Sequence, residues 1–383
     1  MELLPSAWSV ISTGAVFVSG AFVCMKLGPR FRVGQRRSLL LYVWHSIFCV
    51  VYVMYVSESG GDALMYYDAS MVDSVDFTFG TAAVLSVTRL FSYFLGLSIL
   101  GVFSVFNIIG TVGLLAFDGA LRHGVSGKSR GMRRVASILV FLPSVSFWSS
   151  AIGKDAISFC ATGLALWAAI DMKRRFWLMG VAVLLMLSVR PHMAVLLSVA
   201  LAVSVVFNPR VSLLRRCVMG IAAAGASAVL IPLAIGTSGL GNAGGVEAVA
   251  DYVERRQGYN MEGGGGVDIS SMSLPMKMFT YLFRPLPFEA HNLPSFAASI
   301  DNMVLLGLTF LGVWSVRRGR HYLAGVNWMF LLAYSLFGWL LLSLTTANLG
   351  ISMRQKWMFV PMVIFLLVSV IGARRGRDAR DNF

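Results

Sequence analysis

The chain has 383 residues, of which 57% are hydrophobic and only 13% are charged. Soluble domains carry about 25% charged residues, so this composition excludes an ordinary soluble protein. The formal net charge of +14 would suit a nucleic-acid partner, but basic residues that orient membrane helices account for it better, and we expect no nucleic acid. Several apolar stretches are long enough to cross about 30 Å of hydrocarbon, and they lack the alternation of a transmembrane β-barrel. The sequence therefore predicts an all-α polytopic membrane protein.

The apolar stretches predict about eleven transmembrane helices in one integral membrane domain, residues 1–383. They lie near residues 5–25, 38–57, 91–116, 135–150, 156–171, 176–189, 193–207, 217–236, 301–316, 321–345 and 356–372. The two short spans 156–171 and 176–189 would also fit a re-entrant pair, although the basic run between them favours a cytoplasmic turn.

The connections between these spans alternate in charge. Six of them hold 23 of the 32 Lys and Arg residues: 26–37, 122–134, 173–175, 210–216, 317–320 and the tail 374–380. Basic connections stay in the cytoplasm. We therefore expect the N-terminus to lie outside and the C-terminus inside.

Residues 237–300 form the one large outer loop of this topology. Within it, Val246, Val249, Ala250 and Val253 follow the spacing of one helix face, which predicts an amphipathic helix near 246–260. Glycines flank this segment, as expected for a movable lid over a cavity.

Five outer connections carry ionisable side chains at their membrane ends. In chain order these are Asp62 and Asp68 beside Tyr66 and Tyr67, Lys154 with Asp155, Arg190 with His192, Arg284 with Glu289 and His291, and Arg354 with Lys356. Ionisable residues at membrane depth usually face a polar cavity. We therefore expect the five connections to converge on one outward-facing cavity.

Four of these five groups, and the pair Asp301 and Asn302 at the start of a span, also have an ordinary structural explanation. Lys154 and Asp155 would fit an interfacial anchor or a local ion pair, although adjacent residues on a helix do not face each other. The others would fit a helix end at Arg190, a helix cap at Asp62, snorkelling side chains at Arg354 and Lys356, and a simple cap at Asp301 and Asn302. A purely structural role for all five connections at once is less expected than for any one of them.

A resident metal ion or cofactor is not indicated by the residue pattern. The histidines show no His-x-x-x-His spacing, and the cysteines show no Cys-x-x-Cys spacing. Asp62 and Asp68 would offer oxygen ligands to a divalent cation, but two carboxylates make a weak case.

The residue types on the outer face suit a phosphorylated lipid. Arginine presents a planar fork to phosphate oxygens, and a nearby carboxylate can take the proton of an attacking hydroxyl. Together they indicate group transfer from a lipid diphosphate. A transporter or flippase is the alternative, which would place charges near the bilayer midplane and show repeated halves. A scaffold protein would not need five charged turns on one face.

The order of these features resembles bacterial polysaccharide polymerases of the Wzy type, which build O-antigen and exopolysaccharide. The resembling stretches are "GGDALMYY" (60–67), "FWSSAIGKDA" (147–156), "RPH" (190–192), "FRPLPFEAHN" (283–292) and "MRQKWMFVP" (353–361). The resemblance implies a multi-pass glycosyltransferase with an architecture like that of the GT-C enzymes. One departure is the single large outer loop, where some polymerases have two Arg-rich loops, and this leaves polymerase or ligase open.

The same resemblance implies transfer of a glycan from an undecaprenyl diphosphate carrier to a second lipid-linked glycan, at the outer face of the bacterial cytoplasmic membrane. The partners would be polyprenyl-diphosphate-linked glycans, the lipid bilayer and other envelope polysaccharide assembly proteins. An O-antigen ligase, or a transferase that uses a lipid monophosphate sugar, stays an alternative. Asp62 is the expected general base, with His192 and Glu289 as rivals. Diphosphate and sugar would be bound by Lys154, Asp155, Arg190, Arg284, Arg354, Lys356, Asp68 and Tyr67.

Overall fold

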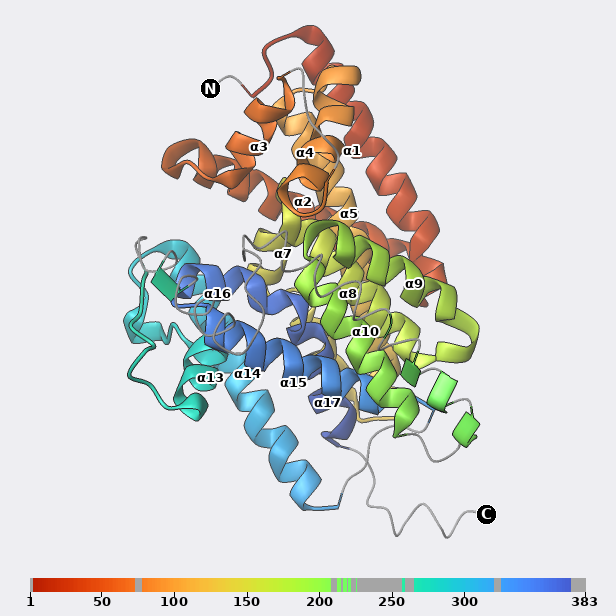
Figure 1. Ribbon diagram of the computed structural model, residues 1–383. Coiled ribbons are helices and arrows are strands. Elements are labelled where there is room, and N and C mark those ends of the chain that lie inside the picture. The colour runs from red at the N-terminus through yellow and green to blue at the C-terminus, as the bar shows by residue number, and fades with distance from the viewer. Residues whose placement is uncertain are drawn as a thin grey trace. The chain divides into compact units, whose positions relative to one another are not determined.

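The computed structural model describes residues 3–72, 78–207, 265–319 and 325–372, together with isolated residues between 212 and 258. Helices make up nearly all of the regular structure in these parts, which confirms the all-α class (Figure 1). The one β-type pairing that they contain is an isolated bridge between Gly266 and Asn348. The chain folds into two compact units. Unit 1 comprises Met1–His123, Ala136–Ala168 and Lys173–Pro191, and unit 2 comprises Gly124–Val135, Ala169–Met172 and His192–Phe383.

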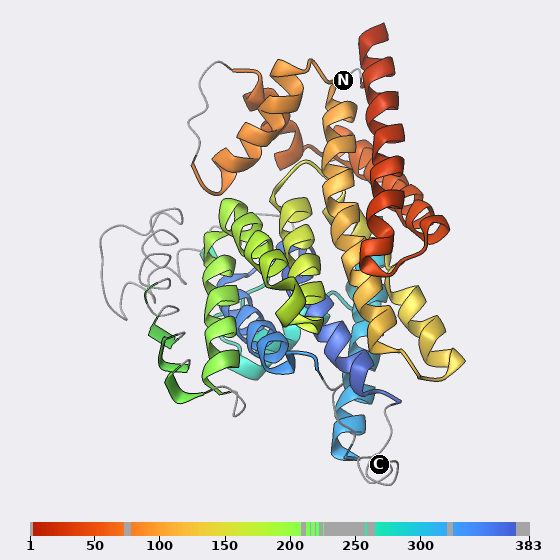
Figure 2. The same cartoon turned by 90° about the vertical axis from the view of Figure 1, so that its right-hand side faces the viewer.

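Long apolar helices form the frame of unit 1. Its elements are α1 (Ala7–Leu27), the 3-10 helix η1 (Gly28–Phe31), α2 (Gln35–Ser59), α3 (Asp62–Ser70), α4 (Thr81–Arg89), the π-helical η2 (Leu90–Phe94), α5 (Ile99–Gly124), α7 (Pro143–Ser149), α8 (Lys154–Ile170) and α9 (Met172–Val189). In this unit α1 packs against α2, α2 packs against α7, and α3 packs against α4. Figure 2 shows α1 and α5 running side by side. Gly20 of α1 lies against the side chain of Ile108 on α5.

Glycines let α5 and α8 approach each other closely. A Cβ atom at Gly113 would lie 2.7 Å from the Cα of Cys160, and one at Gly163 would lie 2.5 Å from the carbonyl oxygen of Gly113. Small residues allow this kind of backbone contact between membrane helices. The contact fixes the level at which α8 begins, and α8 begins with Lys154 and Asp155.

A buried polar network ties α7 to α2 and α5. His45 of α2 places Nδ1 2.6 Å from Oδ1 of Asn107 on α5 and Nε2 2.9 Å from Oγ of Ser149 on α7. Asn107 also donates from Nδ2 to Oγ of Ser46. A satisfied buried network specifies one packing arrangement. It therefore holds the turn between Ser149 and Lys154 in a defined position.

Unit 2 contains the C-terminal helices. Its elements are most of α10 (Pro191–Val206), α13 (Leu274–Phe283), the 3-10 helix η3 (Pro287–Glu289), α14 (Leu293–Arg317), α15 (Trp328–Thr345), α16 (Leu349–Gln355), the 3-10 helix η4 (Lys356–Met358) and α17 (Val360–Val370). α6 (Arg130–Leu139) begins in this unit and ends in unit 1. α13 packs against α14 and α15, and α17 packs against α14 and α15.

Asparagine caps start three of these helices. Asn292, Asn327 and Asn348 each accept a hydrogen bond from the backbone N–H three residues later, at the starts of α14, α15 and α16. An asparagine side chain satisfies one of the N–H groups that a first helical turn leaves open. The cap of α14 is thus Asn292, so the cap that we expected at Asp301 and Asn302 is wrong.

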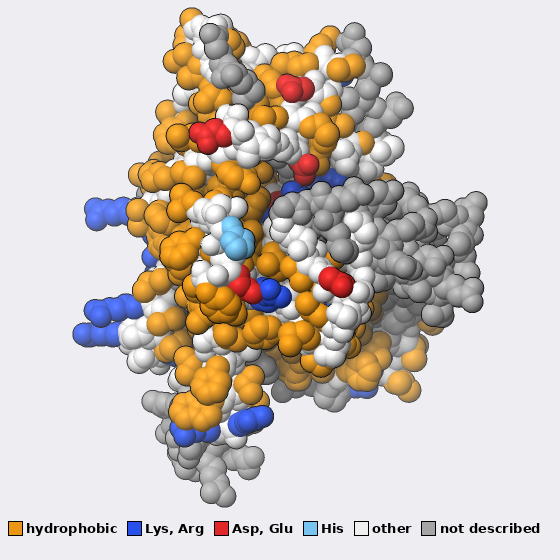
Figure 3. Space-filling model, turned by 90° about the vertical axis from the view of Figure 1, so that its left-hand side faces the viewer, with side chains coloured by type: hydrophobic (Ala, Val, Ile, Leu, Met, Phe, Trp, Pro, Cys, Tyr) orange, Lys and Arg blue, Asp and Glu red, His pale blue; other side chains and the backbone are white. Residues whose placement is uncertain are grey.

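Five described helices could cross a membrane by length and composition: Ala7–Phe31, Gln35–Ser59, Ile99–Gly124, Leu293–Arg317 and Trp328–Thr345. A sixth candidate is the pair Leu349–Met358 and Val360–Val370, which is bent by 63°. Large hydrophobic side chains are exposed on these helices, for example Val18 at 67% and Phe310 at 72%. Hydrophobic side chains also cover much of the surface in Figure 3. Such a surface suits contact with lipid.

The count of eleven spans is not confirmed. Of the expected span 217–236, the structure describes only residues 217, 218, 220, 221 and 225. α8 has 17 residues and α10 has 16, which is shorter than the roughly 20 residues of a typical crossing. The segment 356–372 belongs to the bent pair, because η4 ends at Met358 and α17 starts again at Val360.

Two expected spans differ clearly from the helices found. The segment 135–150 is divided into α6 and α7, because Pro143 excludes the helical conformation at Leu142, whose ψ is 126°. The expected span 91–116 is not one continuous α-helix. Gly96 has a φ of +62°, which is outside the helical range, and α5 begins only at Ile99.

The segment 237–300, expected to be an outer loop, contains α13, η3 and the start of α14. α13 begins with Pro275 in its first turn, a position that proline favours, and buries Thr280, Tyr281, Leu282 and Phe283. The amphipathic helix expected near 246–260 lies outside the described residues, apart from 257–258.

Candidate functional site

The eleven expected site residues fall into two sets. Unit 1 holds Asp62, Tyr67, Asp68, Lys154, Asp155 and Arg190, and unit 2 holds His192, Arg284, Glu289, Arg354 and Lys356. Within each unit, side chains from distant parts of the sequence meet.

Asp155 and Arg190 form an ion pair in unit 1. An Nη atom of Arg190 lies 2.6 Å from a carboxylate oxygen of Asp155, and the two side chains are only 10% and 19% exposed. Asp155 is the second residue of α8, and Arg190 is the residue between α9 and α10. Arg190 keeps a helical hydrogen bond to Met186, and Pro191 then opens α10. Among the described residues, Nε of Arg190 has no hydrogen-bond partner, so this buried guanidinium retains a donor.

Tyr66 of α3 lies beside this ion pair. It belongs to a buried cluster with Ala156 and Val189, the neighbours of Asp155 and Arg190 in the sequence. Burial and then the negative charges of Asp62 and Asp155 raise the pKa of Tyr66, while its hydrogen bond with Thr81 and the charge of Arg190 act in the opposite direction. The phenol therefore stays protonated at neutral pH and can donate a hydrogen bond.

The other expected residues of unit 1 lie on α3 and at the start of α8. Asp62 is exposed at the first residue of α3, after the cap residue Gly61. Lys154 is half-buried at the first residue of α8. Tyr67 donates its hydroxyl to the carbonyl oxygen of Leu97 at 3.1 Å, so that hydroxyl serves packing. Asp68 is exposed on α3.

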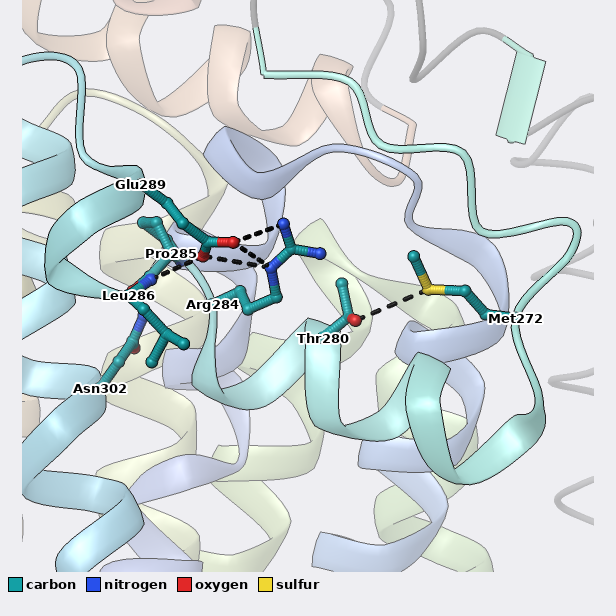
Figure 4. Close-up of polar contacts among 7 residues, drawn as sticks. All are labelled: Met272, Thr280, Arg284, Pro285, Leu286, Glu289 and Asn302. Carbon is teal, nitrogen blue, oxygen red and sulfur yellow. Dashed lines mark hydrogen bonds and ion pairs between the residues drawn. The ribbon is translucent and has the colours of Figure 1, made fainter.

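Arg284 and Glu289 form the ion pair of unit 2, shown in Figure 4. Nη2 of Arg284 lies 2.6 Å from Oε1 of Glu289, and Nε donates to the same carboxylate at 2.8 Å. The backbone N–H of Leu286 also donates to Glu289 at 2.8 Å. Burial opposes the charge on Glu289, but the hydrogen bonds from Arg284 and Leu286 and the charges of Arg284 and His291 outweigh it and lower the pKa of Glu289. A base with a lowered pKa holds protons weakly, so Glu289 is better suited to orienting Arg284 than to proton transfer.

A buried lysine is linked through hydrogen bonds to the segment that holds Arg284 and Glu289. Asn302 of α14 donates from Nδ2 to the carbonyl oxygen of Pro285 at 2.9 Å, and Nζ of Lys356 donates to Oδ1 of Asn302. Lys356 is 1% exposed, and the carboxylate of Asp301 attracts its ammonium group. Lys356 is therefore placed to hold Asn302 rather than to reach an open surface.

His192 and Arg354 are half-buried, on α10 and α16. Their positions do not by themselves assign either residue to the Arg284–Glu289 pair. Three contributors were not predicted as site residues from the sequence: Tyr66, which was named only beside Asp62 and Asp68, and Asp301 and Asn302, which we took for a cap. The signal for the last two was present, because Asp and Asn inside an apolar helix of 25 residues are unusual.

The described residues contain no group of three His, Cys, Asp or Glu side chains that could hold a metal ion. Comparison of the chain with family models, with curated proteins and with solved structures finds no match.

Proposed function

We propose that this protein is a membrane glycosyltransferase that joins polyprenyl-diphosphate-linked glycan units, in the manner of a polysaccharide polymerase with a GT-C-like architecture. The proposal places the N-terminus and the site at the outer face of a bacterial cytoplasmic membrane. It has support from the apolar helices that could span a bilayer and from the alternating charge of the connections.

The observation that carries the proposal is the cluster of Asp62, Tyr66, Asp155 and Arg190 in unit 1. Three segments, separated by about 90 and 35 residues, bring a carboxylate, a phenol and an ion pair to one place. A cluster that served only packing would not need a nearly buried guanidinium with an open N–H donor. A diphosphate oxygen is a suitable acceptor for that donor.

In the proposed reaction, a hydroxyl of the acceptor glycan attacks the anomeric carbon of the donor glycan. The bond between that carbon and the diphosphate oxygen breaks, and the diphosphate leaves on its lipid. Asp62 accepts the hydroxyl proton. Arg190 and Lys154 bind the diphosphate as negative charge builds on it, and Tyr66 donates a hydrogen bond to a phosphate or sugar oxygen. Preorganised donors of this kind stabilise the transition state.

The ion pair with Asp155 has a defined part in this proposal. Without ligand, Asp155 compensates the charge of buried Arg190, which would otherwise be costly to desolvate. With ligand, the pair fixes the direction of the guanidinium, so that Nε points to the phosphate. In unit 2, Arg284 held by Glu289 is a candidate for binding further phosphate or sugar groups.

The test uses purified protein in liposomes that contain a lipid-linked glycan donor and acceptor. The readouts are release of polyprenyl diphosphate and lengthening of the glycan. We expect Asp62→Asn to lower turnover by about 10²–10⁴-fold, the usual contribution of a general base. Glu58→Gln, which changes an exposed acid near the end of α2, is the matched control and should leave turnover unchanged. Movement of the glycan lipid across the bilayer without diphosphate release would instead identify a flippase.

A further inference from the structure

An apolar groove runs between α14 and α17 in unit 2. It encloses about 350 Å³ and is lined by Val313 and Val316 of α14 and by Leu366, Leu367 and Val370 of α17. Gly312, which also lines the groove, lets the two helices approach closely, because a Cβ atom there would overlap the side chain of Leu367. The volume lies within the range of about 300–1,000 Å³ that is typical of small-molecule sites.

Positive charge gathers at one end of this groove. Arg317, the last residue of α14, is itself part of the lining and is exposed. Next to it, the guanidinium of Arg318 lies 3.6 Å from the centre of the Trp314 ring. Tryptophan and arginine at the end of a membrane helix mark the level of the lipid headgroups.

A lysine adds charge at the end of the other helix. Nζ of Lys128 donates to the last carbonyl oxygens around α17, at 2.7 Å to Val368, 2.6 Å to Ser369 and 2.7 Å to Ile371. It thus offsets the partial negative charge of the helix C-terminus next to Val370. The groove is therefore lined by apolar side chains along its length, and basic side chains lie at one end.

We propose that this groove is a binding site for an anionic phospholipid, with one acyl chain between α14 and α17 and the phosphate at Arg317. The apolar lining suits the chain, and the basic end suits a headgroup with net negative charge over one that is neutral overall. The site is separate from the proposed glycosyltransfer. In the orientation of that proposal the connection 317–320 is cytoplasmic, so the lipid would lie in the cytoplasmic leaflet, and only this choice of leaflet rests on the proposed function.

The test measures lipid retention by native mass spectrometry on the delipidated full-length protein in detergent. Dioleoyl phosphatidylglycerol and dioleoyl phosphatidylcholine share the same chains and differ in headgroup charge. We expect phosphatidylglycerol to bind more tightly, and Arg317→Gln to weaken it about fivefold, the factor expected for one basic residue near a membrane surface. Arg30→Gln, which removes an exposed charge of the 26–37 connection, is the matched control and should have no effect.

A second pair of variants tests the acyl-chain contact. Val313 is 47% exposed and lines the groove, whereas Leu311 is 43% exposed and lies outside the lining. Val313→Trp should fill the groove and lower the retention of both lipids, and Leu311→Trp should not. Equal retention of the two lipids by the unmodified protein, or unchanged retention by Arg317→Gln and Val313→Trp, would overturn the site. Stronger retention of a polyprenyl phosphate than of phosphatidylglycerol would also overturn the assignment to a phospholipid.

Discussion

Arg190 and Asp155 lie 35 residues apart in the sequence, and their charged groups are 2.6 Å apart in the structure. Adjacent residues on a helix do not face each other, so Lys154 and Asp155 are expected to have separate partners. For Asp155 that partner is Arg190. The pair is mostly buried, so each charge depends on the other for compensation.

The first prediction concerns the stability of this pair. Asp155→Leu leaves the guanidinium of Arg190 buried without its counter-ion, and we expect a loss of about 3 kcal/mol in the free energy of unfolding. The double variant Asp155→Leu with Arg190→Met removes both charges and should recover most of that loss. Thermal unfolding in detergent measures both. A double variant as unstable as the single one would show that the charges are not coupled.

The second prediction concerns the buried lysine of unit 2. Asn302→Ala removes the acceptor of the Lys356 ammonium group and the donor to Pro285, and we expect it to destabilise unit 2 by about 3 kcal/mol. Adding Lys356→Met removes the buried ammonium group that has lost its hydrogen-bond acceptor and should restore part of the stability. Thermal unfolding of the two variants in detergent is the measurement. An Asn302→Ala protein as stable as the original would show that the hydrogen bonds of Asn302 do not stabilise unit 2.

The sequence predicted the all-helical class of this protein and the positions of several helices. Apolar stretches gave helices at 7–27 and 35–59 within a few residues of expectation, because a span needs a long apolar run. Helix ends that are set by the backbone conformation of a single turn were harder to predict. Pro143 and Gly96 act through backbone conformation and leave hydropathy unchanged, so they did not alter the expected spans.

In the candidate site, the sequence allowed us to select the charged residues but not to predict which of them pair. Charge and position selected Asp155, Arg190, Arg284 and Glu289, and each of these does form an ion pair. The partners were not predictable, because pairing depends on how helices pack. Asn302 was missed for the same reason, since its neighbours Pro285 and Lys356 come from segments 17 and 54 residues away.

A third prediction follows from the lowered pKa of Glu289. A carboxyl group whose pKa is lowered by folding stabilises the folded state above its ordinary pKa of 4.5, and this contribution is lost as the pH falls through the lower, folded value. Glu289→Gln should therefore lower the melting temperature at pH 6. The difference from the unmodified protein should shrink as the pH falls below about 4.5. Melting curves between pH 3 and 6 test this, and a difference that is constant with pH would rule it out.

A fourth prediction concerns orientation. Ser59 ends α2 and Ser126 lies between α5 and α6, and both are exposed. In a background with exposed Cys217 changed to Ser, we expect Ser59→Cys to react with a membrane-impermeant maleimide added to intact cells. Ser126→Cys should react only after the cytoplasmic side is opened. The reverse pattern would invert the topology and remove the outer-face site from the proposal.

The fifth prediction concerns Lys154, at the start of α8 beside Asp155. If its ammonium group binds the leaving diphosphate, Lys154→Ala removes a charge-assisted contact worth roughly 1.5–3 kcal/mol. Because each 1.36 kcal/mol is about tenfold in rate, transfer should fall roughly tenfold to over a hundredfold. Lys154→Arg should keep part of the activity, since the charge stays while the geometry changes. Lys277→Ala, which removes a half-buried lysine of α13, is the control. Polymer length and yield per folded molecule are the measurement, and near-normal transfer by Lys154→Ala would leave Lys154 as an interfacial anchor.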